Sequence, residues 1–365
     1  MRESFLLALF VVLAAASSAQ KRMVLIDEDG SGPGGSNQMA MLALLQSPQV
    51  DVLGITMVTG NAWRDEETLH TLRMLELTGH AHVPVAKGAV FPLVRTELET
   101  RLEEAENGKV AWLGAWGAGQ ATLMETANGV VPVTPPNQQA HGAYDVPPLA
   151  EGMPATKAIE EDAAHFLVRQ VRAHPHEVTI YAAGPMTNIA LAIRIDPEFA
   201  ELTKGIVIMG GSLNPSTDDE EFATSPRHEF NFWFDPEAAH IVLLADWPRV
   251  DVTTVDVSIK APFTEAMLKE IATSDSATAK YIAAWSQDRY YLWDELAACA
   301  WLEPGIITKE RVLYMDVDLS HGPSYGDTLM WDEKRKPATG VRQVHAQVDV
   351  DLARFQRMFV ELMKK

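Results

Sequence analysis

Short runs rich in β-branched and apolar residues alternate with helical patterns along most of this chain, and this alternation constrains the fold more than any other feature. Strand-like runs occupy residues 23–26, 50–58, 83–86, 178–182, 205–209 and 250–255. Helical patterns occupy residues 39–45, 66–77, 158–172, 188–195, 236–244 and most of 263–302. Strands separated by helices of this length form parallel βαβ units. The chain is therefore predicted to be an α/β protein, a single domain with a doubly wound, mostly parallel sheet flanked by helices.

Residues 96–157 interrupt this alternation. They contain a charged helical piece at 97–106, the loop AWLGAWGAG and the stretch VVPVTPPNQQAHGAYDVPP. Long irregular segments inside a compact domain are uncommon and often functional. We expect an insertion that lies over the face carrying the functional site, rather than a second domain.

Residues 1–20 have the layout of a signal peptide. Arg2 precedes an apolar run at 5–16, and small residues follow up to Ala19. Cleavage near Ala19 leaves residues 21–365 as the domain, exported to a periplasm or to the outside. The apolar run is shorter than a membrane span and no other stretch is long and apolar enough, so we expect no membrane contact in the mature form.

The charge of the chain argues against one class of partner. The formal net charge is -20 and the isoelectric point is about 4.9, and a field of this sign repels nucleic acids. Cys299 is the only cysteine, which excludes an internal disulfide and a cysteine-rich metal site.

The stretch MVLIDEDGSGPGGSNQMAMLALL carries polar residues from the end of a strand, through a glycine turn, into a helix. The turn lacks the G-x-G-x-x-G spacing and the lysine of a phosphate-binding loop, and Asp27 and Asp29 would repel phosphates. Two carboxylates and an amide suit a hard cation bound through oxygen, with Asp29, Asn37, a strand-end carbonyl and a more distant acid as its shell. A hydrogen-bonded structural turn is the open alternative.

Four further segments carry a more specific pattern. They read VDVLGITMVTGN, VTIYAAGPMTNIALAIR, IVIMGG followed by HEFNFWFDPEAAHIV, and LWDELAACAWLEP. Together with the first strand and its turn, they resemble the inosine/uridine-preferring nucleoside hydrolase family, whose hallmark is a strand followed by D-x-D-P-G-x-D-D-A and a helix. The resemblance extends from about residue 22 to the C-terminus.

The resemblance implies a calcium site beside a nucleoside-binding cleft. It implies Asp29 as the general base, with Asp27 as a supporting carboxylate. The implied calcium ligands are Asp29, Asn37, the Ala183 carbonyl and Asp294. The implied sugar contacts are Asn61, Glu229, Asn231, Ser36 and Asn214.

Two departures from the family pattern affect the expected chemistry. Ser36 and Asn37 stand where the family has its second acidic pair, so the site loses negative charge. Trp293 stands where some members have a histidine that acts as general acid. Trp112, Trp116 and Trp293 are expected to stack on the base instead, which favours a purine.

We therefore expect hydrolysis of the N-glycosidic bond of a purine ribonucleoside to free base and ribose. Water oriented by Ca²⁺ attacks the sugar, and Asp29 accepts its proton. The expected partner is a small-molecule nucleoside, and the expected assembly is a homo-oligomer, a dimer or tetramer. Two alternatives stay open: hydrolysis of another N-glycoside or modified nucleoside by the same machinery, and non-catalytic binding of a nucleoside or sugar.

Overall fold

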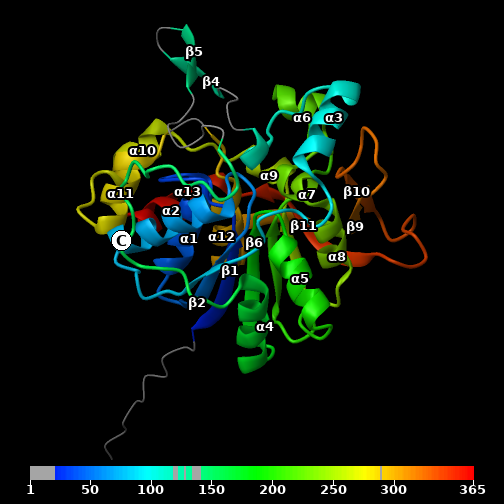
Figure 1. The fold of residues 1–365 in the computed structure, drawn as a ribbon, viewed down its shortest axis with the longest axis horizontal. Coiled ribbons are helices and arrows are strands. Elements are labelled where there is room, and N and C mark those ends of the chain that lie inside the picture. The colour runs from blue at the N-terminus through cyan, green and yellow to red at the C-terminus, as the bar shows by residue number, and fades with distance from the viewer. Residues whose placement is uncertain (1–20, 118–121, 127–128, 134–140, 288–289) are drawn as a thin grey trace, which may run out of the picture.

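The computed structural model describes residues 21–117, 122–126, 129–133, 141–287 and 290–365. Its main element is a nine-stranded sheet in the order β10-β9-β11-β8-β7-β6-β1-β2-β3. The strands of this sheet are β1 Arg22–Glu28, β2 Val50–Met57, β3 Val85–Lys87, β6 Val178–Ala183, β7 Gly205–Met209, β8 Val250–Thr253, β9 Ile307–Val317, β10 Thr328–Trp331 and β11 Arg342–Val350. A separate hairpin pairs β4 Thr122–Thr126 with β5 Gly129–Val133 and projects from the main body (Figure 1).

The predicted doubly wound, mostly parallel sheet is confirmed. Strands β1, β2, β3, β6, β7, β8 and β11 run parallel to their neighbours of this set. The chain builds outward from β1 through β2 to β3, and then on the other side of β1 through β6, β7 and β8. The strand order therefore reverses between β1 and β6, the place where open α/β sheets bind ligands.

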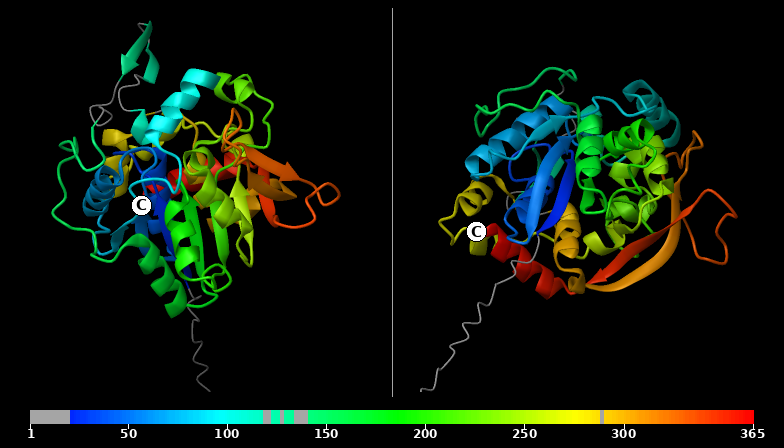
Figure 2. Two further views of the ribbon diagram at one scale, coloured as in Figure 1. Left: turned by 45° about the vertical axis from the view of Figure 1, so that its right-hand side comes forward. Right: turned by 90° about the horizontal axis from the view of Figure 1, so that it is seen from below.

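The C-terminal edge of the sheet was not predicted. Strand β9 runs antiparallel to β11, and β10 runs antiparallel to β9. Figure 2 shows these orange-to-red strands along one side of the molecule. Much of the first half of β9 is exposed, so it lacks the apolar run by which a buried strand is recognised.

Helices cover both faces of the sheet. The helices are α1 Ser36–Leu45, α2 Arg64–Leu77, α3 Glu97–Asn107, α4 Ala163–Ala173, α5 Thr187–Ile195, α6 Glu220–Thr224, α7 Phe230–Phe234, α8 Pro236–Leu244, α9 Val255–Ser258, α10 Glu265–Ile271, α11 Ala277–Trp285, α12 Trp293–Leu302 and α13 Leu352–Met363, with short 3₁₀ turns η1 Gly114–Trp116 and η3 Pro304–Ile306. Helices α1, α12 and α13 lie on one face, and α4, α5 and α8 on the other (Figure 1). Among the described residues, none of these helices has the length and apolar character needed to span a bilayer.

Strand β1 shows how the two layers share one chain. Val24 and Ile26 pack into the core with α1 and α12, whereas Leu25 packs into the core with α4 and α5. Side chains alternate across a strand, so the next residues continue this pattern. Asp27 faces the α5 layer and Glu28 faces the α1 and α12 layer.

Candidate active site

The carboxyl ends of the parallel strands open into a cavity beside the point where the strand order reverses. Glu28 at the end of β1 lies opposite Ala183 at the end of β6. The cavity has a volume of about 380 Å³ and is lined by Ser31, Gly35, Ser36, Asn37, Asn61, Trp112, Ala183, Met209, Glu221, Phe222, Glu229, Phe230, Asn231, Val255, Tyr290, Trp293 and Asp294. The structure thus brings together most of the residues singled out from the sequence. Trp112 comes from the segment expected to be an insertion.

Asp29 lies behind this lining and is fully buried. Its Oδ1 accepts a hydrogen bond from the Asn37 amide at 2.7 Å, and its Oδ2 accepts one from the backbone N–H of Asn61 at 3.0 Å. Gly60 permits this packing, because a Cβ atom at residue 60 would lie 2.1 Å from Oδ2. Asp29 is therefore held by two residues that do line the cavity.

Asp27 faces away from the cavity, toward α5. Its Oδ1 accepts hydrogen bonds from the Thr56 hydroxyl and from the Asn188 amide, the latter at 2.8 Å. Burial raises the pKa of the Asp27 carboxyl to about 7. These contacts tie β1 to β2 and α5, which agrees with a supporting position.

The Asn37 amide is the meeting point of several oxygen atoms. Its Nδ2 donates to Glu28 Oε2 at 2.8 Å and to Asp29 Oδ1 at 2.7 Å, and lies 3.3 Å from the Ala183 carbonyl oxygen. Asn37 is the second residue of α1, and that helix has no acidic residue in its first turn. The amide nitrogen therefore supplies the positive end of a dipole to a cluster of carboxylates.

Helix α12 brings a second pair of carboxylates to the same place. Asp294 lines the cavity, and burial raises the pKa of its carboxyl to about 8. The neighbouring Glu295 is fully buried, and its Oε2 accepts a hydrogen bond from Ser36 Oγ at 2.6 Å. The hydroxyl of Tyr181 donates to the backbone carbonyl of Asp294 at 2.7 Å, which fixes the start of α12 against β6.

These residues can hold a hard divalent cation. Asp29, Asp294 and the Ala183 carbonyl offer only oxygen atoms, and Asn37 adds a fourth oxygen if its amide turns Oδ1 inward. Oxygen donors of this kind suit Ca²⁺ or Mg²⁺. Burial raises the pKa of Asp29 well above its ordinary value, and the nearby Asp294 carboxylate raises it further, so the site favours a positive charge.

Glu229 and Asn231 are fixed at one wall. Glu229 caps α7: its Oε1 accepts from the backbone N–H of Asn231 at 2.9 Å, and its Oε2 accepts from those of Gly211 and Phe232 at 3.0 and 3.1 Å. The Asn231 amide donates to the Met209 carbonyl at 3.1 Å. Both side chains reach the cavity with their positions set by backbone groups, as recognition of sugar hydroxyls requires.

Aromatic rings form part of the lining. The rings are those of Trp112, Phe222, Phe230, Tyr290 and Trp293. The rings of Phe222 and Trp293 meet edge to face, with centroids 5.8 Å apart. Such a wall can receive a flat heterocyclic base.

Two predicted contacts are not brought to the cavity. Trp116 is only 3% exposed and stacks on Phe234, with ring centroids 4.4 Å apart, so it belongs to a buried aromatic cluster. Asn214 is exposed and adopts a φ of 78°, a conformation that asparagine tolerates in turns. Neither is among the residues that line the cavity.

Three acidic residues at this site were not predicted from the sequence. Glu28 and Glu295 lie beside the predicted ligands, and Glu221 lines the cavity from α6. Burial raises the pKa of Glu221 to about 7, with smaller contributions from Asp219 and Glu229. Side-chain alternation along β1 was the available signal for Glu28, since it assigns this residue to the same face as α1.

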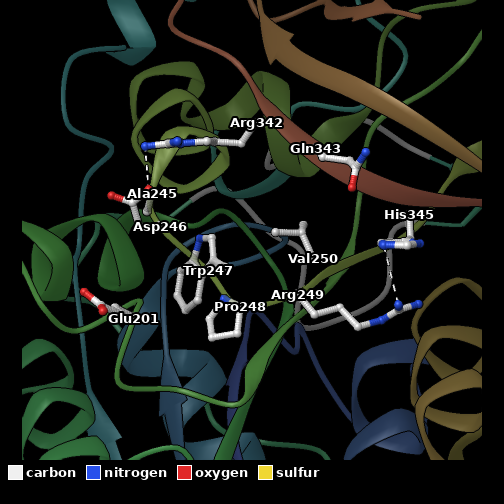
Figure 3. A pocket seen from close by; sticks show the side chains of 10 residues that line it. All are labelled: Glu201, Ala245, Asp246, Trp247, Pro248, Arg249, Val250, Arg342, Gln343 and His345. Atoms are coloured by element: carbon white, nitrogen blue, oxygen red, sulfur yellow. Dashed lines mark hydrogen bonds and ion pairs between the residues drawn. The ribbon is translucent and has the colours of Figure 1, made fainter. Parts of the chain in front are cut away.

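A larger cavity, of about 510 Å³, lies where β8 and β11 begin (Figure 3). Its two arginines are paired: Arg342 with Asp246 at 2.5 Å, and Arg249 with Asp251 at 2.6 Å. The amino-terminal edge of a parallel sheet is not where open α/β folds bind ligands. This cavity is therefore not the candidate active site.

A cluster of Glu99, Glu103 and His321 is likewise separate from the site. Their ligand atoms lie within 4.8 Å of one another. Glu103 pairs with Arg95 at 2.7 Å and His321 with Glu99 at 2.9 Å, so the cluster is satisfied by its own ion pairs. None of the three lines the cavity at the carboxyl ends of the strands.

A sheet that gathers carboxylates, amides and aromatic rings at its switch point defines an enzyme with a site for a small polar and aromatic ligand. Residues 24–357 match the model of the family described as inosine-uridine preferring nucleoside hydrolase. The chain belongs to this family. It is an N-glycosidase that hydrolyses nucleosides, and enzymes of the family in general depend on a metal ion.

Individual relatives are similar to this protein over nearly the whole chain. A probable uridine nucleosidase 1 of Oryza sativa subsp. japonica is 28% identical, covering 93% of this chain and 96% of the relative. An inosine-uridine preferring nucleoside hydrolase of Leishmania major is 26% identical, covering 90% and 94%. A solved plant nucleoside hydrolase superposes with a TM-score of 0.70 at 25% identity, covering 94% of this chain and 99% of that one. A purine-preferring ribonucleoside hydrolase from Gardnerella vaginalis shares the fold, with a TM-score of 0.71 at 22% identity over 94% and 98%.

Proposed function

We propose that this protein hydrolyses ribonucleosides, with a preference for purines, in a Ca²⁺-dependent reaction in which Asp29 is the general base. The observation that carries the proposal is the convergence of Asp29, Asp294 and the Ala183 carbonyl at a cavity lined by aromatic rings. A binding protein has no use for buried carboxylates that can prime a water molecule. Their presence favours the enzyme.

The proposed mechanism begins with positioning of the sugar. Asn61, Glu229 and Asn231 hold its hydroxyl groups. The Trp112 indole N–H, which donates to Asn61 Oδ1, fixes the Asn61 side chain, and the contacts described above fix the other two. A cation held by Asp29, Asp294 and the Ala183 carbonyl would orient a water molecule and lower its pKa. Asp29 accepts the proton of that water as it attacks the anomeric carbon, where positive charge develops.

Asn37 must move for this to happen. In the structure its amide donates a hydrogen bond to Oδ1 of Asp29, and the backbone N–H of Asn61 donates one to Oδ2. The general base is therefore engaged by protein donors. Turning the Asn37 amide releases Oδ1 for a water molecule.

The leaving base is proposed to be activated in two ways. Trp112 and Trp293 stack on it, which replaces the sandwich first expected to include Trp116. Glu221, at the same wall as Phe222 and Trp293, donates a proton to the base as the bond breaks. Its raised pKa of about 7 leaves a substantial protonated fraction near neutral pH.

The purine preference rests on the cavity wall alone. The relatives described above are named as uridine, inosine-uridine-preferring and purine-preferring enzymes. A wide aromatic wall gives a two-ring base more stacking area than a one-ring base.

A nucleoside panel tests the proposal. The purified mature protein is incubated with inosine, adenosine, guanosine, uridine and cytidine, with Ca²⁺ or with a chelator, and free base and ribose are quantified. We expect release of purine bases that the chelator abolishes and added Ca²⁺ restores. Binding of nucleosides without turnover would favour the alternative of a binding protein, and cleavage of modified nucleosides alone would favour the other alternative.

We further propose that the mature protein is exported and forms a homo-oligomer. The signal-like layout of residues 1–20, which lie outside the described residues, supports export. N-terminal sequencing of the exported form tests cleavage near Ala19, and light scattering of the purified protein tests a dimer or tetramer.

A further inference from the structure

The Asn37 amide has more acceptors around it than it can satisfy. An amide NH₂ group has two hydrogens. Its nitrogen lies 2.7 Å from Asp29 Oδ1, 2.8 Å from Glu28 Oε2 and 3.3 Å from the Ala183 carbonyl oxygen. Three oxygen atoms of three different residues thus converge on one point that now holds a nitrogen.

Glu28 has a second oxygen that is not used. Its side chain is fully buried, and Oε1 makes no hydrogen bond to any described residue. Glu295 is also fully buried. Its Oε2 accepts a hydrogen bond from Ser36, and its Oε1 makes no hydrogen bond to any described residue. A buried, unpartnered carboxylate oxygen is costly unless a cation or a proton accompanies it.

Protein side chains do not supply that positive charge. Within the described residues, no lysine or arginine forms an ion pair with Glu28, Asp29 or the pair Asp294 and Glu295. Four carboxylates in close proximity are buried together. A divalent cation is the simplest charge that stabilises them all.

The two unexpected acids also match the two missing acids. Ser36 and Asn37 are uncharged where the family motif has an acidic pair. Asn37 contacts Glu28, and Ser36 contacts Glu295. In each case a carboxylate from a neighbouring element reaches the neutral side chain on α1, so the negative charge lost from the helix is restored from β1 and α12.

We propose that Glu28 is a direct ligand of the divalent cation, replacing the carboxylate absent at Asn37, and that Glu295 restores the charge absent at Ser36. The cation displaces the Asn37 nitrogen from the point where the oxygens of Glu28, Asp29 and Ala183 converge. The proposal rests on the proposed function only in placing a cation beside this cavity.

Calcium titration calorimetry of the metal-stripped, full mature chain tests this assignment without any substrate. Glu28→Gln preserves size and removes one charge, and we expect it to weaken Ca²⁺ binding by about tenfold or more. Adding Asn37→Asp to that variant returns a carboxylate to α1, and we expect it to recover most of the loss. Wild-type affinity in Glu28→Gln, or no recovery in the double variant, would overturn the proposal.

Asp27→Asn is the matched control. It removes a buried carboxylate from the adjacent position of the same strand, on the opposite face. We expect a change of less than about threefold in calcium affinity, because Asp27 contacts Thr56 and Asn188 instead of the oxygen cluster. An equal loss in Asp27→Asn and Glu28→Gln would show a diffuse charge effect and contradict direct ligation.

Three further cases are also decisive. If Glu28→Gln does not fold, Asn37→Asp in the wild-type background replaces it, and tighter calcium binding is expected, whereas unchanged binding counts against the cluster. Absence of calcium binding by the folded wild type overturns the assignment. Calcium binding that depends on Glu28, without nucleoside hydrolysis, supports the ligand assignment while refuting the proposed function.

Discussion

The indole N–H of Trp112 donates a hydrogen bond to Oδ1 of Asn61 at 2.8 Å. This contact joins the segment expected to be an insertion to the loop that follows β2. Both residues line the cavity, and the backbone N–H of Asn61 also binds Asp29. The aromatic wall, a predicted sugar contact and the candidate base are therefore mechanically connected.

Trp112→Phe should separate stacking from hydrogen bonding. The ring remains, but Asn61 loses the donor that orients it. A hydrogen bond of this kind contributes about 0.5–1.5 kcal/mol, so we expect kcat/KM to fall about two- to tenfold. Steady-state kinetics on the preferred nucleoside provide the measurement.

Trp116→Phe is the control for that variant. Trp116 packs on Phe234 away from the cavity lining, so the change should lower the melting temperature while leaving kcat/KM near the wild-type value. A larger kinetic effect at Trp116 than at Trp112 would contradict the assignment of the aromatic wall.

Glu221→Gln tests the leaving-group acid. The protonated carboxyl donates, so activity that depends on Glu221 should fall as the pH rises above its pKa of about 7. The glutamine variant should lose about 100-fold in kcat and should no longer show this alkaline decline. A wild-type pH–rate profile in the variant would exclude the role.

Gly60→Ala tests how closely Asp29 must be packed. The added Cβ would lie 2.1 Å from Asp29 Oδ2, so the carboxylate must shift. A displacement of about 1 Å at a reacting group can lower the rate by about 100-fold, and we expect a loss of that order in kcat. Gly322→Ala, whose added Cβ would lie 3.9 Å from the Ser320 carbonyl oxygen, should leave kcat unchanged.

His228 makes stability depend on acid pH. Burial lowers the pKa of its imidazole to about 4, with a smaller effect of the nearby Arg95. The unfolded state therefore binds a proton near pH 6.5, whereas the folded state binds it only near pH 4. The free energy of unfolding consequently falls by up to about 3 kcal/mol as the pH drops through this range. Relative to His228→Phe, the wild type should lose free energy of unfolding as the pH falls from 6.5 to 4. Denaturant titrations that give a constant difference would contradict this.

Much of the site follows from the sequence because parallel strands deliver their carboxyl ends to one edge. That rule places Asp29, Asn61 and Ala183 together although they are far apart in the chain. The family motif then adds Asp294 and Glu229. Both lie at the cavity, on elements whose relative placement local periodicity does not give.

The remainder depends on packing that local pattern does not encode. Trp112 and Trp116 are four residues apart and chemically identical, yet one lines the cavity and the other is buried on Phe234. No role was predicted for Glu28 from the sequence, although side-chain alternation along β1 directs it toward α1. Its proposed role as a cation ligand depends on its contact with Asn37, which only the folded structure shows.

Asp29→Asn provides the most direct test of the account. The variant keeps the shape of the side chain but cannot accept a proton from water. At saturating Ca²⁺ and nucleoside, we predict a kcat at least about 100-fold below the wild-type value, with the fold intact by circular dichroism. A folded, calcium-loaded Asp29→Asn protein that turns over its nucleoside at close to the wild-type rate would contradict the assignment of Asp29 as the general base.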